Sequence, residues 1–204
     1  MSLSSGRSYL AIPGPSVIPD EVLRAMHRPS PNIYEGELIE ITKSVIPDLK
    51  YVAKTAGNVA IYIANGHGAW EAALANIVEA GEQVLVAATG RFAHGWAEMA
   101  HRLGVSSEII EFGNQSPLEA GAIEDALRRD KDKKIKAVLI THVDTSTSVK
   151  NDVAAVRQAM DNADHPALLA VDCIASLGCD DFEMDAWGVD VMVAGCQKGL
   201  MVPP

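Results

Sequence analysis

The sequence lacks a long apolar run and an excess of positive charge. Its 204 residues include 17 Lys and Arg against 27 Asp and Glu, a formal net charge of -10. Because such a surface repels phosphate groups, general binding to nucleic acid or to a membrane surface is excluded as the expected function. A membrane-spanning helix needs roughly 18 or more apolar residues, and the N-terminal MSLSSGRSYL lacks the apolar core of a signal peptide. The sequence therefore predicts a cytoplasmic protein with small-molecule partners.

Cysteine is also scarce, with Cys173, Cys179 and Cys196 as its only instances. An odd number of cysteines without CxxC or zinc-ligand spacing argues against a disulfide framework. We expect these residues to be small buried side chains beside strands. The hydrophobic share of 48% and the charged share of 22% are typical of a folded globular chain.

From about residue 59 onward, apolar runs alternate with amphipathic stretches. Strands are expected at 59–64, 83–89, 105–112, 136–142, 167–172 and 189–195, with helices at 69–80, 92–103, 118–130 and 152–163. This alternation predicts an α/β fold with a mostly parallel sheet flanked by helices. Proline-rich segments before it predict an extended N-terminal arm, and a helix is expected from about residue 36 to 56. The expected division is an arm with a substrate or dimer loop at 1–35 and a cofactor-binding domain at 36–204.

Two of the apolar runs lead to residues of opposite charge. ALLAVD ends at Asp172, and VDVMVAGCQK ends at Lys198. Neighbouring parallel strands would bring both side chains to one edge of the sheet. Pyridoxal phosphate (PLP) needs a lysine to hold its aldehyde as a Schiff base and an acid to keep its pyridine nitrogen protonated. The pair therefore favours a PLP site, although charged residues follow strands in many α/β proteins whatever they bind.

A glycine-containing turn, Asn65, Gly66, His67 and Gly68, lies between an expected strand and an expected helix. Free N–H groups at the start of a helix attract anions, and glycine lets a phosphate approach closely. The same turn could simply reverse the chain. It does not match GxGxxG, which argues against a dinucleotide site.

Two further loops carry side chains that suit a planar, phenolic cofactor. Phe92 could lie against a ring, and Thr145 lies within a run of short polar side chains at 144–148. Core packing would also explain the phenylalanine, and a capped turn would explain the polar run. Because loops after parallel strands gather at one edge, we expect both to meet Asp172 and Lys198 in one crevice.

A metal hydrolase is a competing interpretation. His94, Glu98 and His101 are spaced by four and three residues, which places them on one face of the expected helix. The HExxH order and a nearby fourth ligand are lacking, and the wet face of an amphipathic helix explains the same pattern. We therefore expect no metal.

Five segments in order carry a family resemblance: ANGHGAWEAALANI, ATGRFAHGW, THVDTSTSV, VDCIASLG and GCQKGLMVPP. They resemble the class V, fold-type I PLP-dependent aminotransferases, most closely the serine–glyoxylate and alanine–glyoxylate group. The resemblance covers nearly the whole chain and implies the large PLP-binding domain of this fold type. It also implies a chain truncated just after the PLP lysine, without the C-terminal small domain whose arginine grips the substrate carboxylate.

The resemblance implies a role for each matching residue. Lys198 corresponds to the catalytic Schiff-base lysine, which also moves the substrate proton, and Asp172 to the catalytic partner of the pyridine nitrogen. The implied cofactor-binding set is Asn65, Gly66, His67, Phe92, Thr145, Asp172, Gln197 and Lys198. Within it, Gly66, His67 and Gln197 would lie near the phosphate, Phe92 on the ring and Thr145 near the 3-oxygen. Pro13, Gly14 and Pro15 would border the substrate pocket, and Ser148 stands where the family often has glycine.

The implied activity is transfer of the amino group of serine or alanine to glyoxylate or another 2-oxo acid. The family also implies a homodimer with its active site at the subunit interface. Two alternatives stay open. A cysteine-desulfurase-like or other class V enzyme shares the fold type, but desulfurases usually place His before the lysine, where this chain has Gln197. The chain could also be an inactive cofactor-binding fragment.

Overall fold

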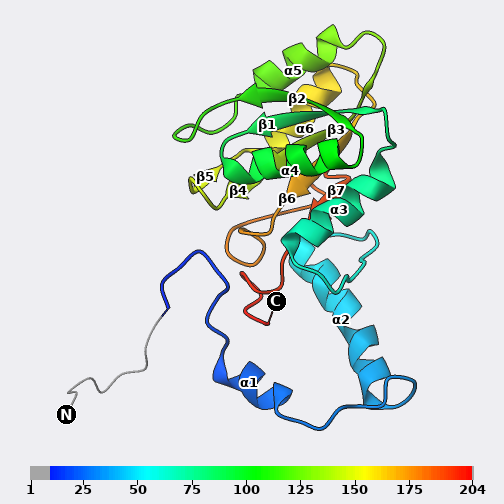
Figure 1. The fold of residues 1–204 in the computed structure, drawn as a ribbon, viewed down its shortest axis with the longest axis vertical. Helices are drawn as coiled ribbons and strands as arrows, with labels where there is room; N and C mark the ends of the chain where they lie inside the picture. Colours follow the sequence, from blue (N-terminus) through cyan, green and yellow to red (C-terminus); the bar gives the residue numbers. More distant parts are fainter. Residues whose placement is uncertain (1–9, 204) are drawn as a thin grey trace, which may run out of the picture.

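The computed structural model describes residues 10–203, which form a parallel sheet with helices on both faces (Figure 1). The helices are α1 (Asp20–Met26), α2 (Glu37–Ala53), α3 (Gly66–Ile77), α4 (Arg91–Arg102), α5 (Ala120–Arg129) and α6 (Val153–Asn162). The strands of the main sheet are β1 (Gln83–Ala88), β2 (Ser106–Glu111), β3 (Ile135–Thr141), β6 (Leu168–Asp172) and β7 (Val191–Val193). Their order is β2-β1-β3-β6-β7, and all neighbours run parallel. The predicted α/β class is confirmed.

Strand β1 shows how the sequence pattern builds the two layers. Val84 and Val86 belong to the apolar cluster that includes residues of α3 and α4, whereas Leu85 and Ala87 belong to the cluster that includes residues of α5 and α6. Successive side chains of a strand point to opposite faces. A continuous apolar run is therefore what a central strand covered on both faces requires.

The predicted strand at 59–64 is wrong. These residues form no regular element and pair with no strand in the described part of the chain, and Ile61, Tyr62 and Ile63 are exposed. A β-strand is stabilised by its partner, and the apolar pattern of the segment does not supply one. The predicted strand at 189–195 is also shorter than expected, so Lys198 lies in a turn beyond β7.

Other differences concern local structure. The arm contains the short helix α1, and Val143–Asp144 (β4) pairs antiparallel with Val149–Lys150 (β5) around the polar run. In that hairpin Ser148 has φ 60°, the left-handed region in which glycine is favoured. Cys173 is buried as expected, but Cys179 and Cys196 are exposed, so the expectation of buried cysteines is wrong for these two. Within 10–203, no helix is long and apolar enough to cross a membrane.

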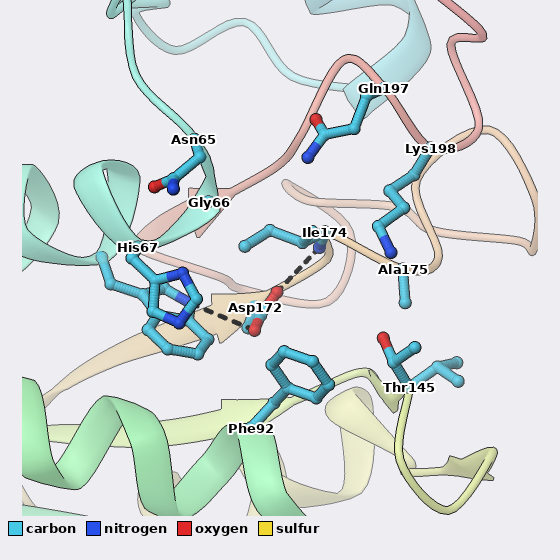
Figure 2. A pocket seen from close by; sticks show the side chains of 12 residues that line it. Asn65, Gly66, His67, Phe92, Thr145, Asp172, Ile174, Ala175, Gln197 and Lys198 are labelled. Carbon is cyan, nitrogen blue, oxygen red and sulfur yellow. Dashed lines mark hydrogen bonds between the residues drawn. The ribbon is translucent and has the colours of Figure 1, made fainter. Parts of the chain in front are cut away.

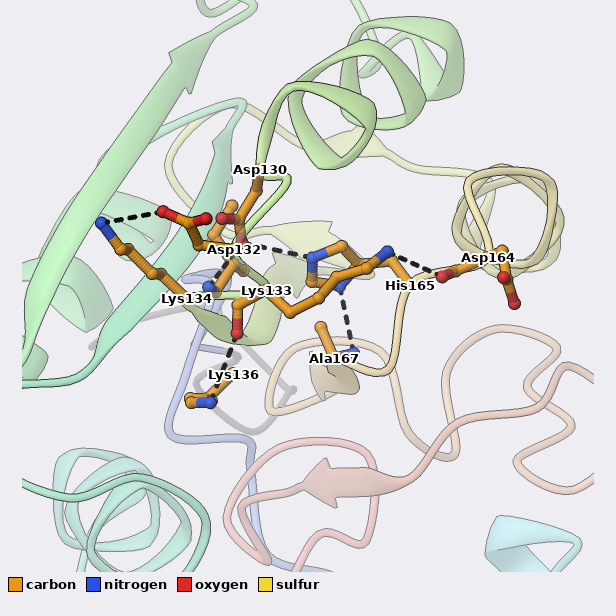
Figure 3. A network of polar contacts seen from close by, with 9 residues as sticks. Asp130, Asp132, Lys133, Lys134, Lys136, Asp164, His165 and Ala167 are labelled. Atoms are coloured by element: carbon orange, nitrogen blue, oxygen red, sulfur yellow. Dashed lines mark hydrogen bonds and ion pairs between the residues drawn. The ribbon is translucent and has the colours of Figure 1, made fainter.

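A buried histidine joins β3 and β6 near the ends where these strands begin (Figure 3). The Ala167 N–H donates to His165 Nδ1 at 3.2 Å, so the ring proton lies on Nε2 and points to Asp130 Oδ2, 3.2 Å away. The same Asp130 oxygen accepts the Ile135 N–H at 2.7 Å. Burial lowers the pKa of His165 below 6.5 and outweighs the opposite effect of Asp130. His142, also buried, has its pKa lowered for the same main reason.

We expect His142 and His165 to contribute a decrease in the free energy of unfolding as the pH drops through 6.5. The folded-state pKa values of His142 and His165 lie below 6.5, so in that range the unfolded chain binds protons that the folded chain does not. His165→Ala should cost about 1–3 kcal/mol at pH 7.5, because Asp130 and Ala167 lose a partner, and should remove the His165 share of this decrease. Urea unfolding at pH 5.5 and 7.5 measures both effects. His101→Ala, at an exposed position of α4, is the control, and an equally steep profile in both variants would contradict the prediction.

Candidate active site

The predicted cofactor-binding residues gather around one cavity of about 250 Å3 at the C-terminal edge of the sheet (Figure 2). This volume lies near the lower end of small-molecule sites, which span roughly 300 to 1,000 Å3. All eight residues of the predicted cofactor set line it: Asn65, Gly66, His67, Phe92, Thr145, Asp172, Gln197 and Lys198. Four further residues complete the wall: Trp70, Val143, Ile174 and Ala175. The parallel sheet explains the gathering, since β1, β3, β6 and β7 all end at this edge.

The N-terminus of α3 forms one end of the cavity. Asn65 is the N-cap, and its side-chain oxygen accepts the Gly68 N–H at 3.2 Å. The N–H groups of Gly66 and His67 have no acceptor among residues 10–203. A Cβ at Gly66 would lie 2.5 Å from Ile174 Cδ1, so a side chain there would require the end of the Ile174 side chain to move. Two unpaired donors at a helix N-terminus suit an anionic group.

Asp172 lies at the end of β6 and is only 4% exposed. Its Oδ1 accepts the Ile174 N–H at 2.7 Å, and its Oδ2 accepts the Trp70 Nε1–H at 3.1 Å. Burial is the main cause that raises the pKa of Asp172 to about 7, and the charge of Asp144 also raises it. The two hydrogen bonds and Lys198 lower this pKa but do not offset the effect of burial. The carboxylate is thus poised to gain from a cationic partner in the cavity.

Of the four lining residues that sequence reasoning missed, Trp70 is the one whose side chain donates a hydrogen bond to Asp172. Its indole is 1% exposed and stacks on Trp96, with ring centroids 6.0 Å apart. The same ring meets His67 and Phe92 edge-on, at centroid distances of 4.8 and 6.2 Å. Its position in an apolar helical stretch predicts core packing, and only the fold shows that its N–H reaches Asp172.

Phe92 and Thr145 enter the cavity from adjoining elements. Phe92 lies in the first turn of α4, and Thr145 follows β4 in the turn of the small hairpin. Figure 2 shows the Phe92 ring near Asp172 and the Thr145 hydroxyl on the side where the Lys198 amine points. The predicted crevice therefore contains both residues.

The N-terminal arm contacts Lys198 directly. The Lys198 Nζ donates to the Pro13 carbonyl at 3.0 Å, and Ser16 Oγ donates to the Lys198 carbonyl at 2.9 Å. A Cβ at Gly14 would lie 2.5 Å from Lys198 Nζ, so this position accepts no larger side chain with the lysine as placed. Pro13, Gly14 and Pro15 do not line the cavity itself. Pro13 and Gly14 instead lie against the Lys198 side chain.

The metal-site residues find other partners. His94 Nε2 lies 3.3 Å from Glu111, and Glu98 forms an ion pair with Arg102. Within the part of the chain that the structure describes, no three His, Cys, Asp or Glu side chains are placed to hold a metal ion. The geometry gives the metal hydrolase interpretation no support.

Comparisons with known proteins agree with this arrangement. The Aminotransferase class-V family matches residues 8–204. The chain is 43% identical to a serine–glyoxylate aminotransferase of Methylorubrum extorquens over 97% of its length and 50% of that protein. It is 41% identical to an L-aspartate–glyoxylate aminotransferase of Paracoccus denitrificans over 98% of its length and 51% of that protein. The solved structure of an alanine–glyoxylate aminotransferase from Nostoc sp. aligns with a TM-score of 0.88 and 28% identity, covering 100% of this chain and 54% of the other. The chain thus spans about half the length of the curated relatives it matches.

Proposed function

Because this chain belongs to the aminotransferase class-V family, we propose that it carries the PLP site of a transaminase. The proposed reaction moves the amino group of a small amino acid, serine or alanine, to glyoxylate or another 2-oxo acid. The observation that carries the proposal is the shared cavity of Lys198 and the buried carboxylate of Asp172.

The cavity's chemistry fits each part of PLP. The unpaired N–H groups of Gly66 and His67 suit the phosphate, and Gln197 adds a polar side chain to the lining. The Asp172 carboxylate suits a protonated ring nitrogen. When bound, PLP supplies an electron sink that stabilises negative charge at the carbon next to the substrate's amino group.

Each cavity residue would then have a distinct role in the reaction. Lys198 Nζ would hold the cofactor's aldehyde and, once an amino donor displaces it, accept the proton from the donor's α-carbon. The Pro13 carbonyl, which now accepts a hydrogen bond from Nζ, would orient this amine. Phe92 would cover one face of the ring, and Thr145 would donate to its 3-oxygen. Pro13, Gly14 and Pro15 would border the substrate beyond the lysine.

The direct test is a titration of the purified protein with PLP, followed by visible absorbance, and then a panel of amino donors with glyoxylate. A PLP-dependent band and transfer from serine or alanine support the proposal, whereas a protein that binds no PLP contradicts it. An intact-mass measurement of the same sample shows whether its chain continues past residue 204. A substrate-gripping group beyond that residue is part of the proposal, since the relatives are about twice as long.

A homodimer with its active site at the subunit interface is proposed for the same protein. Large apolar side chains are exposed on the arm, α2 and the unpaired segment before α3: Ile33, Tyr34, Ile41, Tyr51, Ile61, Tyr62 and Ile63. That segment runs directly into Asn65 and Gly66 of the cavity. Extended apolar surface of this kind is uncommon on monomers and marks interfaces.

A cytoplasmic location stays a prediction. The boundary between the arm (1–35) and the domain (36–204) also stays a prediction, and residues 1–9 of the arm lie outside the described part.

A charged residue within this surface should therefore weaken the dimer. We expect Ile63→Glu to raise the dissociation constant of the dimer by at least about tenfold, because the substitution buries an unpaired charge in the interface. Light scattering after size exclusion measures the mass. Ile109→Glu, on β2 and 38% exposed, is the matched control. A wild-type protein that is monomeric at all concentrations would contradict the dimer.

A further inference from the structure

The turn that contains Thr145 also accepts hydrogen bonds from the first turn of α4, which contains Phe92. We propose that Asp144 and Ser146 are positioning residues that fix the Phe92 ring and the Thr145 hydroxyl relative to each other across the cavity. The inference rests on the proposed function, because it concerns the geometry of the same cofactor site.

Asp144 is fully buried, and both of its oxygens are used as acceptors. Its Oδ2 accepts the N–H groups of Phe92 and Ala93 at 3.0 and 3.3 Å. Its Oδ1 accepts from Ser146, at 2.9 Å from the backbone N–H and 2.6 Å from the hydroxyl. The carboxylate thus ties the first turn of α4 to its own hairpin turn.

Ser146 adds a second link between the same two segments. Its hydroxyl oxygen accepts the Arg91 N–H at 2.9 Å, which completes the first turn of α4. The N-cap residue of α4 is Gly90, which has no side chain to do this. A Cβ at Gly90 would overlap with the Asp144 carboxylate, so the loop leaves that space to the capping group. Because the hairpin turn supplies the cap, the start of α4 and this turn are held in a fixed relative position.

The placement of the two cavity residues follows from these bonds. Thr145 lies between Asp144 and Ser146 in the chain, and Phe92 lies between Arg91 and Ala93, whose N–H groups are held. Asp144 and Ser146 do not line the cavity containing Lys198, so they position it through their neighbours. The charge of Asp144 also raises the pKa of Asp172, so Ser146→Ala, which removes no charge, isolates the positioning effect. Preorganised partners are what tight binding of a planar ring requires, since an ångström of looseness costs affinity.

The test compares Asp144→Asn with Ser146→Ala in the protein loaded with PLP. Asparagine keeps the shape of the side chain but replaces one carboxylate oxygen by an NH2 group. That group would face an N–H donor and could not accept its hydrogen bond. We expect PLP to bind about tenfold more weakly in Asp144→Asn and about threefold more weakly in Ser146→Ala. We also expect the circular dichroism of the bound cofactor, which reports its fixed orientation, to fall in both. Unfolding in urea is measured in parallel.

Asp152→Ala is the matched control. Asp152 caps α6 by accepting the Ala155 N–H at 3.0 Å, away from the cavity residues. It should lose stability without a change in PLP affinity or in the dichroism signal. Variants at 144 and 146 that lose stability but bind PLP with wild-type affinity and dichroism would overturn the inference. If Asp144→Asn does not fold, Ser146→Ala decides alone, and a wild-type protein that binds no PLP refutes the proposed function instead.

Discussion

Replacement of Lys198 by alanine is expected to abolish both the covalent attachment of PLP and transamination. Among residues 10–203, Lys198 is the only lysine that lines the cavity. The loss should be about 10⁴-fold or more, because one side chain both holds the cofactor and moves the proton. Visible absorbance of the dialysed protein and a single-turnover assay with serine or alanine measure the two effects separately.

Two comparison variants make this result specific. Lys136→Ala removes an exposed lysine that does not line the cavity and whose Nζ donates to the Lys133 carbonyl, and it should leave absorbance and turnover unchanged. Lys198→Arg keeps the positive charge against the Pro13 carbonyl but cannot bond to the aldehyde in the same way. It should behave like the alanine variant. An unaltered absorbance band in Lys198→Ala would refute the assignment of this lysine.

Replacement of Asp172 by asparagine is expected to lower transamination by about 10²- to 10³-fold. The buried carboxylate would stabilise the protonated ring nitrogen, and a neutral amide cannot. Because burial raises the pKa of Asp172 to about 7 in the cofactor-free protein, the carboxylate gains its charge as the pH rises through that value. The ratio of wild-type to variant PLP affinity should therefore grow between pH 6 and pH 8, which absorbance titrations at both pH values measure.

The same carboxyl has an effect that needs no cofactor. Its folded-state pKa of about 7 is above the ordinary 3.8, so between these values the folded chain keeps a proton that the unfolded chain releases. Asp172 thus lowers the stability of the cofactor-free protein as the pH rises from about 4 to 7. Asp172→Asn should remove this decline in urea unfolding. Identical pH profiles for variant and wild type would show that Asp172 titrates at its ordinary value.

Trp70→Phe separates the hydrogen bond from the packing around Asp172. Phenylalanine keeps an aromatic ring against Trp96 but loses the N–H that Asp172 Oδ2 accepts at 3.1 Å. Since that bond lowers the pKa of Asp172, its loss should raise the pKa and move the pH dependence of PLP binding towards alkali. The effect should be smaller than that of Asp172→Asn, because the Ile174 N–H remains.

Periodicity in the sequence was enough to predict the parallel sheet and the meeting of Phe92, Thr145, Asp172 and Lys198 at one edge, whereas the family resemblance implied the full cofactor set. A central strand buried on both faces is a short apolar run, and a helix at a sheet face is an amphipathic one, so both are visible in local order. Once the strands are parallel, the loops after them must share an edge, and Asp172 and Lys198 follow from that rule.

Other features depended on partners that no local pattern reveals. The apolar run at 59–64 predicts a strand, yet it has no partner among the described residues and stays exposed. Cys179 and Cys196 have the same residue type as Cys173, but only Cys173 lies under the sheet's helices. The residue type determines the chemical properties of a side chain, whereas its burial depends on which other parts of the folded chain pack against it.

The charges of Asp172 and Lys198 were thus readable in the sequence, but their surroundings were not. Trp70 reaches Asp172 across 102 positions of the chain, and Lys198 Nζ reaches the Pro13 carbonyl across 185. Local sequence order records the propensity and periodicity of neighbouring residues. The hydrogen bonds that set the pKa of a buried acid and the position of an amine join residues far apart, so only the folded chain determines them.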